Sequence, residues 1–133
     1  QINALGGKLV DAFGIDVAQL VEVARCGINK INVDTDIRLA CTRNVLQLFT
    51  KYPELKNSPS IGGVYEALIA NPKNVDPRNY VATVMDAILY GQEKDEDVSR
   101  LMQCMKDGVV DACAPLLVQF GSYRKSDLIG PCL

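Results

Sequence analysis

The chain has 133 residues, of which 48% are hydrophobic and 23% are charged, and its net charge is −2. This composition is typical of a globular protein and excludes a disordered chain. The charge balance gives no support for a nucleic acid or a membrane surface as a partner, and the apolar runs are too short to span a bilayer. The sequence contains no histidine, which excludes a Ser-His-Asp triad and any His-based zinc site built from this chain alone.

The cysteines predict reduced thiols rather than a disulfide scaffold. Their number is odd, and no pair has C-x-x-C spacing. Three of them fall in apolar helical patterns, so we expect them to pack as small hydrophobic side chains in a cytoplasmic protein. The cysteines are Cys26, Cys41, Cys104, Cys113 and Cys132.

The N-terminal part of the chain predicts helical structure. Residues 1–14 have the pattern of a helix end, stopped by a pair of glycines and followed by an irregular link. Residues 16–26 space their apolar side chains three and four apart, as an amphipathic helix requires, and Asp16 is placed to cap its start. The abrupt start at Gln1, without an initiator Met, favours a chain that begins inside a longer protein.

The segment 28–34 (INKINVD) is the one part of the chain with strong strand character. It is short, rich in β-branched residues, and bounded by Gly27 and a polar stretch. Alternation along a strand would put Asn32 and Asp34 on the same face. Because a lone strand is not stable, we expect its partner strands to come from outside this chain.

The rest of the chain is predicted to be mostly α-helical. A helix with a broad apolar side follows the strand at 35–51, and a break precedes a short helix at 61–70, for which Ser60 is the expected cap. Pro115 is expected to kink or interrupt the last helix. Beyond residue 70 we expect a polar loop at 71–78, helices at 80–89 and 98–120, and an irregular tail at 121–133.

Polar side chains are concentrated where the predicted strand ends and the next helix begins, in GINKINVDTDIRLA (residues 27–40). Such a junction is a common ligand site in α/β proteins, and the free N–H groups of the helix favour a phosphate there. The alternative is ordinary capping, in which Asp34 or Thr35 caps the helix and Asn32 satisfies backbone groups. Spacing alone leaves both interpretations open.

The same block closely resembles the last barrel strand and following helix of class II, zinc-dependent fructose-bisphosphate aldolases. The family pattern there is G-hydrophobe-x-K-hydrophobe-N-hydrophobe-D-[ST]-D. Three further stretches resemble family motifs in the right order: GGKLVDAFGIDVAQL before the block, DPRNY (76–80) and FGS (120–122) after it.

The resemblance implies an α/β fold, namely a (β/α)8 TIM barrel of which this chain is the mostly helical C-terminal segment. Residues 1–133 would then belong to one barrel domain. The last barrel strand and its helix would occupy 27–51, and a C-terminal helical extension would occupy 52–133.

The resemblance also implies roles for five side chains. Asn32 matches the asparagine that hydrogen-bonds the dihydroxyacetone phosphate part of the substrate and its enediolate, which makes it the candidate catalytic residue. Asp34 matches the aspartate beside it in the site, and Thr35 matches the residue that contacts the C1 phosphate. Arg38 is placed to meet the C6 phosphate. Arg78 matches an arginine that reaches into a neighbouring subunit's site to bind that phosphate.

These residue types suit the implied chemistry. An Asn amide can donate to a developing oxyanion without becoming charged. A Thr hydroxyl and helix N–H groups anchor one phosphate, while the planar fork of arginine suits the other. The alternative for both arginines is a solvated surface charge, and Asp36 is expected only to cap or brace the helix.

The implied reaction is the cleavage of fructose 1,6-bisphosphate to dihydroxyacetone phosphate and glyceraldehyde 3-phosphate, as in glycolysis and gluconeogenesis. The implied cofactor is zinc, acting as a Lewis acid, with its ligands upstream of this chain and none within it. The implied partners are the phosphorylated sugar, the upstream part of the same barrel, and further subunits in a homodimer or larger oligomer.

Two stretches, around 55–75 and 91–98, are additional to the family pattern and bear on where Arg78 lies. The chain by itself is expected to be inactive. The alternative functions are a tagatose-bisphosphate aldolase and a non-catalytic, phosphate-binding helical module that folds independently.

Overall fold

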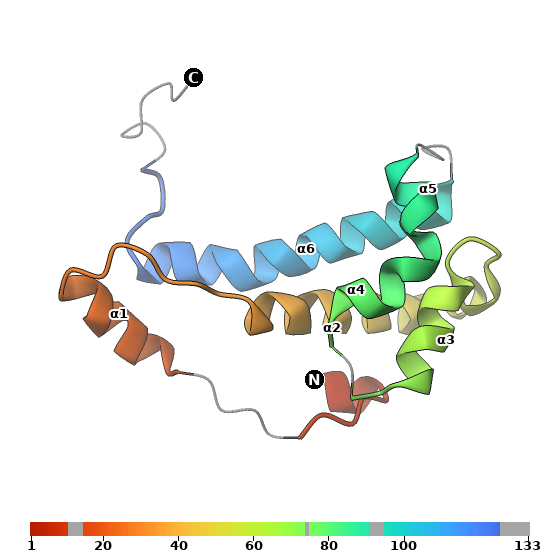
Figure 1. Ribbon diagram of the computed structural model, residues 1–133, viewed down its shortest axis with the longest axis horizontal. Coiled ribbons are helices and arrows are strands. Elements are labelled where there is room, and N and C mark those ends of the chain that lie inside the picture. Colours follow the sequence, from red (N-terminus) through yellow and green to blue (C-terminus); the bar gives the residue numbers. More distant parts are fainter. Residues whose placement is uncertain (11–14, 74, 91–94, 126–133) are drawn as a thin grey trace.

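A computed structural model describes residues 1–10, 15–73, 75–90 and 95–125, and the regular structure in these ranges is helical (Figure 1). None of the described helices is both long enough and apolar enough to cross a membrane. In chain order the elements are the 3-10 helix η1 (Ile2–Leu5), α1 (Val17–Arg25), α2 (Thr35–Lys51), the 3-10 helix η2 (Pro53–Asn57), α3 (Gly62–Ala70), α4 (Pro77–Tyr80), the 3-10 helix η3 (Val81–Val84), α5 (Met85–Leu89) and α6 (Glu96–Gln119).

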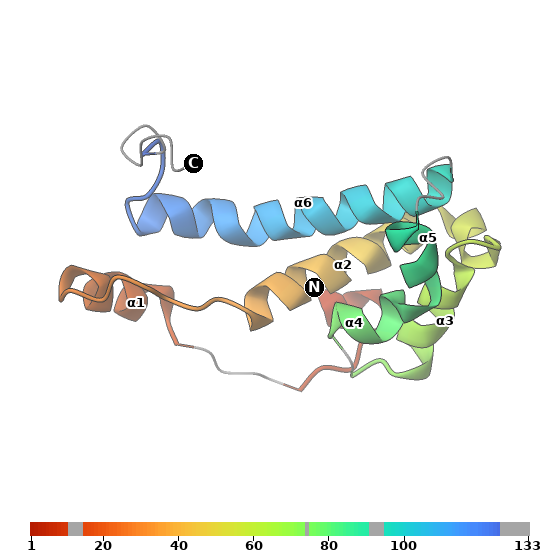
Figure 2. The same cartoon turned by 45° about the horizontal axis from the view of Figure 1, so that its top comes forward.

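The two long helices, α2 and α6, run alongside each other and form the centre of the molecule (Figures 1 and 2). They approach closely at Gly108 of α6. A Cβ atom added to Gly108 would lie 2.8 Å from both the backbone nitrogen and the Cα of Cys41 on α2. Real Cβ contacts are not that short, so a residue without a side chain lets the two backbones meet here.

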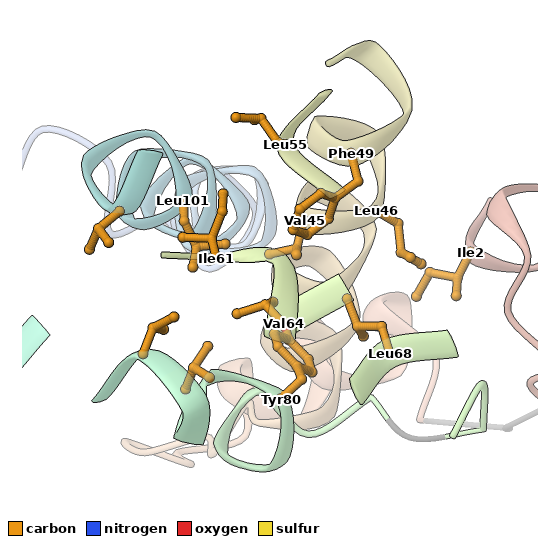
Figure 3. Close-up of a cluster of buried hydrophobic side chains, with 13 residues drawn as sticks. Ile2, Val45, Leu46, Phe49, Leu55, Ile61, Val64, Leu68, Tyr80 and Leu101 are labelled. Carbon is orange, nitrogen blue, oxygen red and sulfur yellow. The ribbon is translucent and has the colours of Figure 1, made fainter. Parts of the chain in front are cut away.

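A buried cluster fills the space between α2, α3, α6 and the turn formed by α4 and η3 (Figure 3). Fully burying one large apolar side chain contributes roughly 1.5–3 kcal/mol, so this cluster is the main source of stability in the described structure. Its members are Ile2, Val45, Leu46, Phe49, Leu55, Ile61, Val64, Leu68, Tyr80, Val81, Val84, Val98 and Leu101.

Helix α1 lies apart from this core (Figure 1). The carboxylate of Asp16 caps its start by accepting a hydrogen bond from the backbone N–H of Ala18 at 3.0 Å. The helix is followed by Cys26 and by Gly27, whose φ of +99° is the left-handed conformation that glycine favours. No residue of α1 is buried, although one side of the helix is apolar.

The segment 28–34, predicted to be a strand that pairs with strands outside this chain, does not form a strand in this structure. These residues connect α1 to α2 without belonging to a helix, and within the described ranges no residue lies in a strand. A strand is stable only when its backbone pairs with another strand. The described residues supply no such partner, so the alternating sequence has nothing to pair with.

The first predicted helices are confirmed. The expected helices at 16–26 and 35–51 are α1 and α2. The short helix expected at 61–70 is α3, but the predicted cap is wrong. The residue at the cap position of α3 is Ile61, without a side-chain hydrogen bond, while the Ser60 hydroxyl donates to the carboxylate of Asp95 instead.

The later helices differ more from prediction. The polar loop expected at 71–78 ends early because Pro77 opens α4, and the single helix expected at 80–89 is divided among α4, η3 and α5. The helix expected at 98–120 begins at Glu96, because the Asp95 carboxylate caps it by accepting from the N–H groups of Asp97 and Val98.

Pro115 does not interrupt α6, which continues to Gln119. Proline has no backbone N–H and so removes one helical hydrogen bond. Only about one further turn follows Pro115, so this missing bond lies near the end of α6 and does not stop the helix. The end of the predicted tail (126–133) and the first half of the additional stretch at 91–98, residues 91–94, lie outside the described residues.

The four described cysteines are free thiols. Burial raises the pKa of Cys41, which lies at the crossing of α2 and α6, and raises that of Cys104 to about 12. Cys41 is buried, and Cys104 and Cys113 are half-buried, so these three pack as predicted, whereas Cys26 is exposed. Cys132 lies outside the described residues.

Candidate functional site

The five predicted site residues lie in two places: around the start of α2 and at the start of α4. Asn32 is exposed in the connection before α2. Asp34 stands at the cap position of α2, and Thr35 is its first residue. Arg38 lies one turn further along α2, and Arg78 is the second residue of α4.

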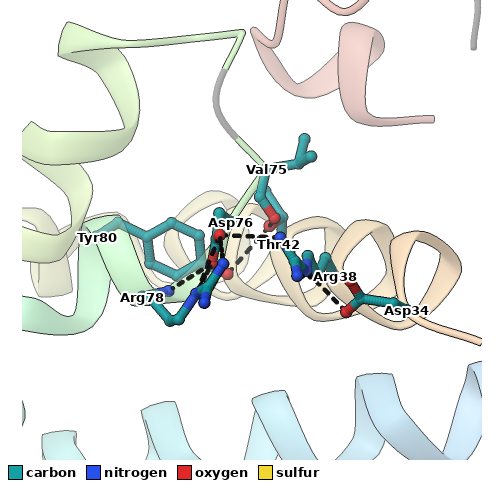
Figure 4. Close-up of polar contacts among 7 residues, drawn as sticks. All are labelled: Asp34, Arg38, Thr42, Val75, Asp76, Arg78 and Tyr80. Carbon is teal, nitrogen blue, oxygen red and sulfur yellow. Dashed lines mark hydrogen bonds and ion pairs between the residues drawn. The ribbon is translucent and has the colours of Figure 1, made fainter.

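Asp76 brings the two predicted arginines together (Figure 4). Arg38 donates from Nη1 to Asp76 Oδ2 at 2.9 Å. Arg78 donates from Nε to Asp76 Oδ1 at 3.0 Å and from Nη2 to Asp76 Oδ2. In the sequence, Asp76 was only the first residue of the DPRNY motif and had no predicted role of its own. In the structure it is the carboxylate that joins α4 to α2.

Arg38 also holds Asp34, so four side chains form one ion-pair chain: Asp34, Arg38, Asp76 and Arg78. Arg38 donates from Nε to Asp34 Oδ1 at 2.8 Å and from Nη2 to Asp34 Oδ2. The two outer members are the more exposed, with side-chain exposures of 66% for Asp34 and 76% for Arg78. Asp76 is the most buried member at 18%.

This arrangement holds Asp76 firmly in its ionised form. The side-chain hydrogen bond from Arg78 lowers the pKa of Asp76 the most. The backbone N–H of Arg78 and the charge of Arg38 lower it further, whereas partial burial raises it. Together they lower the pKa of Asp76 from 3.8 to about 2. The same contacts raise the pKa of Arg78. Asp76 is therefore charged at any pH near neutrality.

A second, buried contact fixes the same turn on α2. The Thr42 hydroxyl donates to the backbone carbonyl of Val75 at 3.1 Å and lies 3.0 Å from the Tyr80 hydroxyl. Since a carbonyl only accepts, the Thr42 proton points to Val75, and Tyr80 is the donor to Thr42. Tyr80 is almost completely buried, which raises its pKa and keeps it protonated.

Thr35 lines a cavity of about 190 Å³ with two cations, Lys8 and Lys73. The backbone N–H of Lys8 donates to the carbonyl of Pro72 at 2.8 Å, which holds the two lysine-bearing segments next to each other. Sequence reasoning missed both lysines, because they are 65 residues apart and come close only once the chain has folded.

The start of α2 does not follow the capping interpretation of Asp34. Asp34 occupies the cap position, but its side chain caps no N–H group of α2 and binds Arg38 instead. The interpretation of Arg38 as a solvated charge is also wrong, since it is held by two carboxylates. Arg78 is exposed but paired with Asp76.

Comparison with known proteins identifies the family. A family model described as fructose-bisphosphate aldolase class-II matches residues 11–116, which is most of the chain. The chain belongs to the class II fructose-bisphosphate aldolase family.

Several curated fructose-bisphosphate aldolases are also similar in sequence to this chain. The fructose-bisphosphate aldolase of Nostoc sp. is 32% identical over 128 residues, covering 96% of this chain and 24% of the relative. Those of Stutzerimonas stutzeri and Giardia intestinalis are each 33% identical over 87 residues, covering 65% of this chain and 19% and 21% of the relatives. The chain thus spans about a fifth to a quarter of these aldolases. No solved structure matches it.

The class II aldolase family is zinc-dependent, but the part of the chain that the structure describes does not fit a zinc site. The sequence has no histidine, and among the described residues no three Cys, Asp or Glu side chains are grouped so that they could hold a metal ion.

Proposed function

We propose that this chain is the C-terminal segment of a fructose-bisphosphate aldolase and supplies its substrate and phosphate contacts. The full protein would cleave fructose 1,6-bisphosphate to dihydroxyacetone phosphate and glyceraldehyde 3-phosphate. The observation that carries this proposal is the family match over residues 11–116, which includes the N-x-D-T-D motif leading into α2. Zinc would be held by residues outside this chain.

The proposed domain assignment places 27–51 as the last strand and helix of a (β/α)8 barrel and 52–133 as its helical extension. Two features support it. The segment 28–34 has strand-like sequence without a strand partner among the described residues, and α1 carries an apolar side with no buried residue. An unpaired strand-like segment and an uncovered apolar helix side are both expected when the rest of the barrel, which would cover them, lies outside this chain.

We assign the proposed roles by chemistry. Asn32 would donate from its amide to the oxyanion that develops on the bound ketose fragment, and Thr35 would bind the C1 phosphate. Arg38 and Arg78, joined by Asp76, would bind the C6 phosphate as paired forks. Arg78 is the most exposed of the four side chains Asp34, Arg38, Asp76 and Arg78, which is compatible with its proposed reach into a neighbouring subunit of a homodimer or larger oligomer in the cytoplasm.

The test is a coupled cleavage assay on the intact protein, with and without exhaustive chelation of metal. We expect cleavage to depend on metal, and Asn32→Ala to lower kcat by about 100- to 1000-fold, as the loss of one oxyanion donor does. Asn29→Ala, in the same connection, is the matched control and should retain activity. Cleavage that survives both chelation and Asn32→Ala would contradict the proposal. Running tagatose 1,6-bisphosphate in parallel decides between the two epimers.

A second candidate is a phosphate-binding helical module that functions without a barrel. The observation in its favour is the buried cluster between α2, α3 and α6, which this chain builds from its own residues. The intact mass of the undigested polypeptide separates the two candidates. A mass near 14.5 kDa with a cooperative melt supports the module, whereas a mass several times larger supports the aldolase.

A further inference from the structure

Every nitrogen of the Arg38 guanidinium is engaged by a carboxylate. Nε and Nη2 donate to the two oxygens of Asp34, and Nη1 donates to Asp76. The Nε–Nη2 edge is one of the edges at which arginine binds a phosphate with two parallel hydrogen bonds. Asp34 therefore holds an edge of Arg38 that a phosphate would use.

The two carboxylates on Arg38 are not equivalent. Asp76 is 18% exposed and also binds the Arg78 side chain. In addition, it accepts a hydrogen bond from the backbone N–H of Arg78 at 3.0 Å. The Asp34 side chain is 66% exposed and pairs with Arg38. An ion pair this exposed is weak, because water and dissolved salt screen its charges. Asp34 is thus the partner that can be replaced, and Asp76 is the one that stays.

We propose that Asp34 and a substrate phosphate compete for the same edge of Arg38, so that the phosphate binds there as Asp34 leaves. This inference deepens the proposed function and rests on it. Asp76 keeps Arg38 and Arg78 in place during the exchange, so Asp76 is a positioning residue for both arginines.

The charges of the four side chains favour such an exchange. Two aspartates and two arginines sum to zero, so a phosphate dianion gains little attraction from the complete ion-pair chain. Displacement of Asp34 leaves the phosphate with two guanidiniums and one carboxylate. The released Asp34 stands at the cap position of α2 and caps no N–H group there, so it can accept from the first turn as a capping aspartate ordinarily does.

The experiment is calorimetric titration of inorganic phosphate into the intact protein and its variants. We expect Asp34→Asn to tighten phosphate binding by roughly fivefold, because the exposed ion pair no longer competes. Asp36→Asn is the matched control, since it removes the same charge two residues away in the first turn of α2, and it should change the affinity by less than about twofold. In an Arg38→Ala background, Asp34→Asn should give no gain.

The outcomes separate this inference from the proposed function. If Asp34→Asn weakens phosphate binding or leaves it unchanged, or if the gain persists in the Arg38→Ala background, competition at Arg38 is wrong even when the protein cleaves fructose 1,6-bisphosphate. If Asp34→Asn tightens phosphate binding in a protein that does not cleave the sugar, the exchange stands and the proposed reaction fails. A merely structural role for Asp34 would not give tighter binding together with an unchanged melting temperature.

Discussion

Residues 35–119 and residues 15–34 both carry periodic apolar side chains, but they place them differently. In the first region α2, α3 and α6 bury theirs in a shared cluster. In the second region α1 buries none, and the connection 28–34 has no strand partner among the described residues. The contrast teaches that local sequence is enough to shape α1, whereas only long-range contact decides which side of an element becomes core.

The largest effect is expected inside the self-contained region. Phe49 is 1% exposed, and its ring centroid lies 5.2 Å from that of Tyr65. Phe49→Ala should lower the free energy of unfolding of the intact protein by about 3–5 kcal/mol, because it removes contacts and leaves a cavity. Denaturant unfolding measures this change, with the exposed Tyr90→Phe as the neutral control. A loss below about 1 kcal/mol would mean that this cluster is not the core of the protein.

A smaller but more informative effect is expected on α1. Leu20 is half-buried in the described structure, yet in the proposed barrel its side of α1 packs on the rest of the protein. Leu20→Ala should then cost about 2–3 kcal/mol in the same unfolding experiment, while Val23→Ala, on the exposed side, should cost less than about 0.5 kcal/mol. Equal, small losses at both positions would contradict the barrel assignment and favour the independent module.

A change at Tyr80 tests the buried contact that joins the two helices of the site. Tyr80→Phe removes the donor to Thr42 but leaves the Thr42 bond to the Val75 carbonyl intact. We expect a loss of about 1 kcal/mol in stability, typical of one hydrogen bond. Because Asp76 follows Val75 directly, phosphate affinity should also fall in this variant. Unchanged stability and affinity would show that the hydroxyl contact does not position the turn.

The smallest effect concerns pH. The pKa of Asp76 is lowered to about 2, mainly by its hydrogen bond with Arg78. A lowered carboxyl pKa stabilises the fold fully above the ordinary value of 3.8, and this contribution is lost as the pH falls from about 4 toward 2. The melting temperature should therefore fall over this window, and Asp76→Asn should flatten the fall, whereas Asp36→Asn should not. A wild-type and an Asp76→Asn profile of equal slope would refute the assignment.

Local patterns predicted the helices well because helices are local structures. The bounds of α1 and α2 followed from three- and four-residue spacing and from Asp16 as a cap. The strand at 28–34 was predicted from equally good local features but does not form among the described residues, because a strand needs partner strands and those predicted for it lie outside this chain. It stays a prediction for the full protein. Ser60 was wrongly predicted to cap α3, because its actual hydrogen-bond partner, Asp95, lies 35 residues away in the sequence.

The site was predictable in its members but not in its connections. The family resemblance supplied Asn32, Asp34, Thr35, Arg38 and Arg78, and their catalytic and binding roles stay predictions. What no local pattern contained is that Asp76 joins Arg38 to Arg78, a contact spanning 38 residues. Nor did it show that Asp34 turns to Arg38 instead of capping α2.

The two contacts between α2 and the turn before α4 have a consequence for how this chain can vary. The excursion through η2 and α3 begins directly at the end of α2, and its returning end is fixed to the same helix because Arg38 binds Asp76 and Thr42 binds Val75. The entropy of closing a loop rises only slowly with its length. Insertions and deletions at the exposed positions of this excursion, away from the buried residues Leu55, Ile61, Val64 and Leu68, can therefore accumulate at little cost while Arg78 keeps its place.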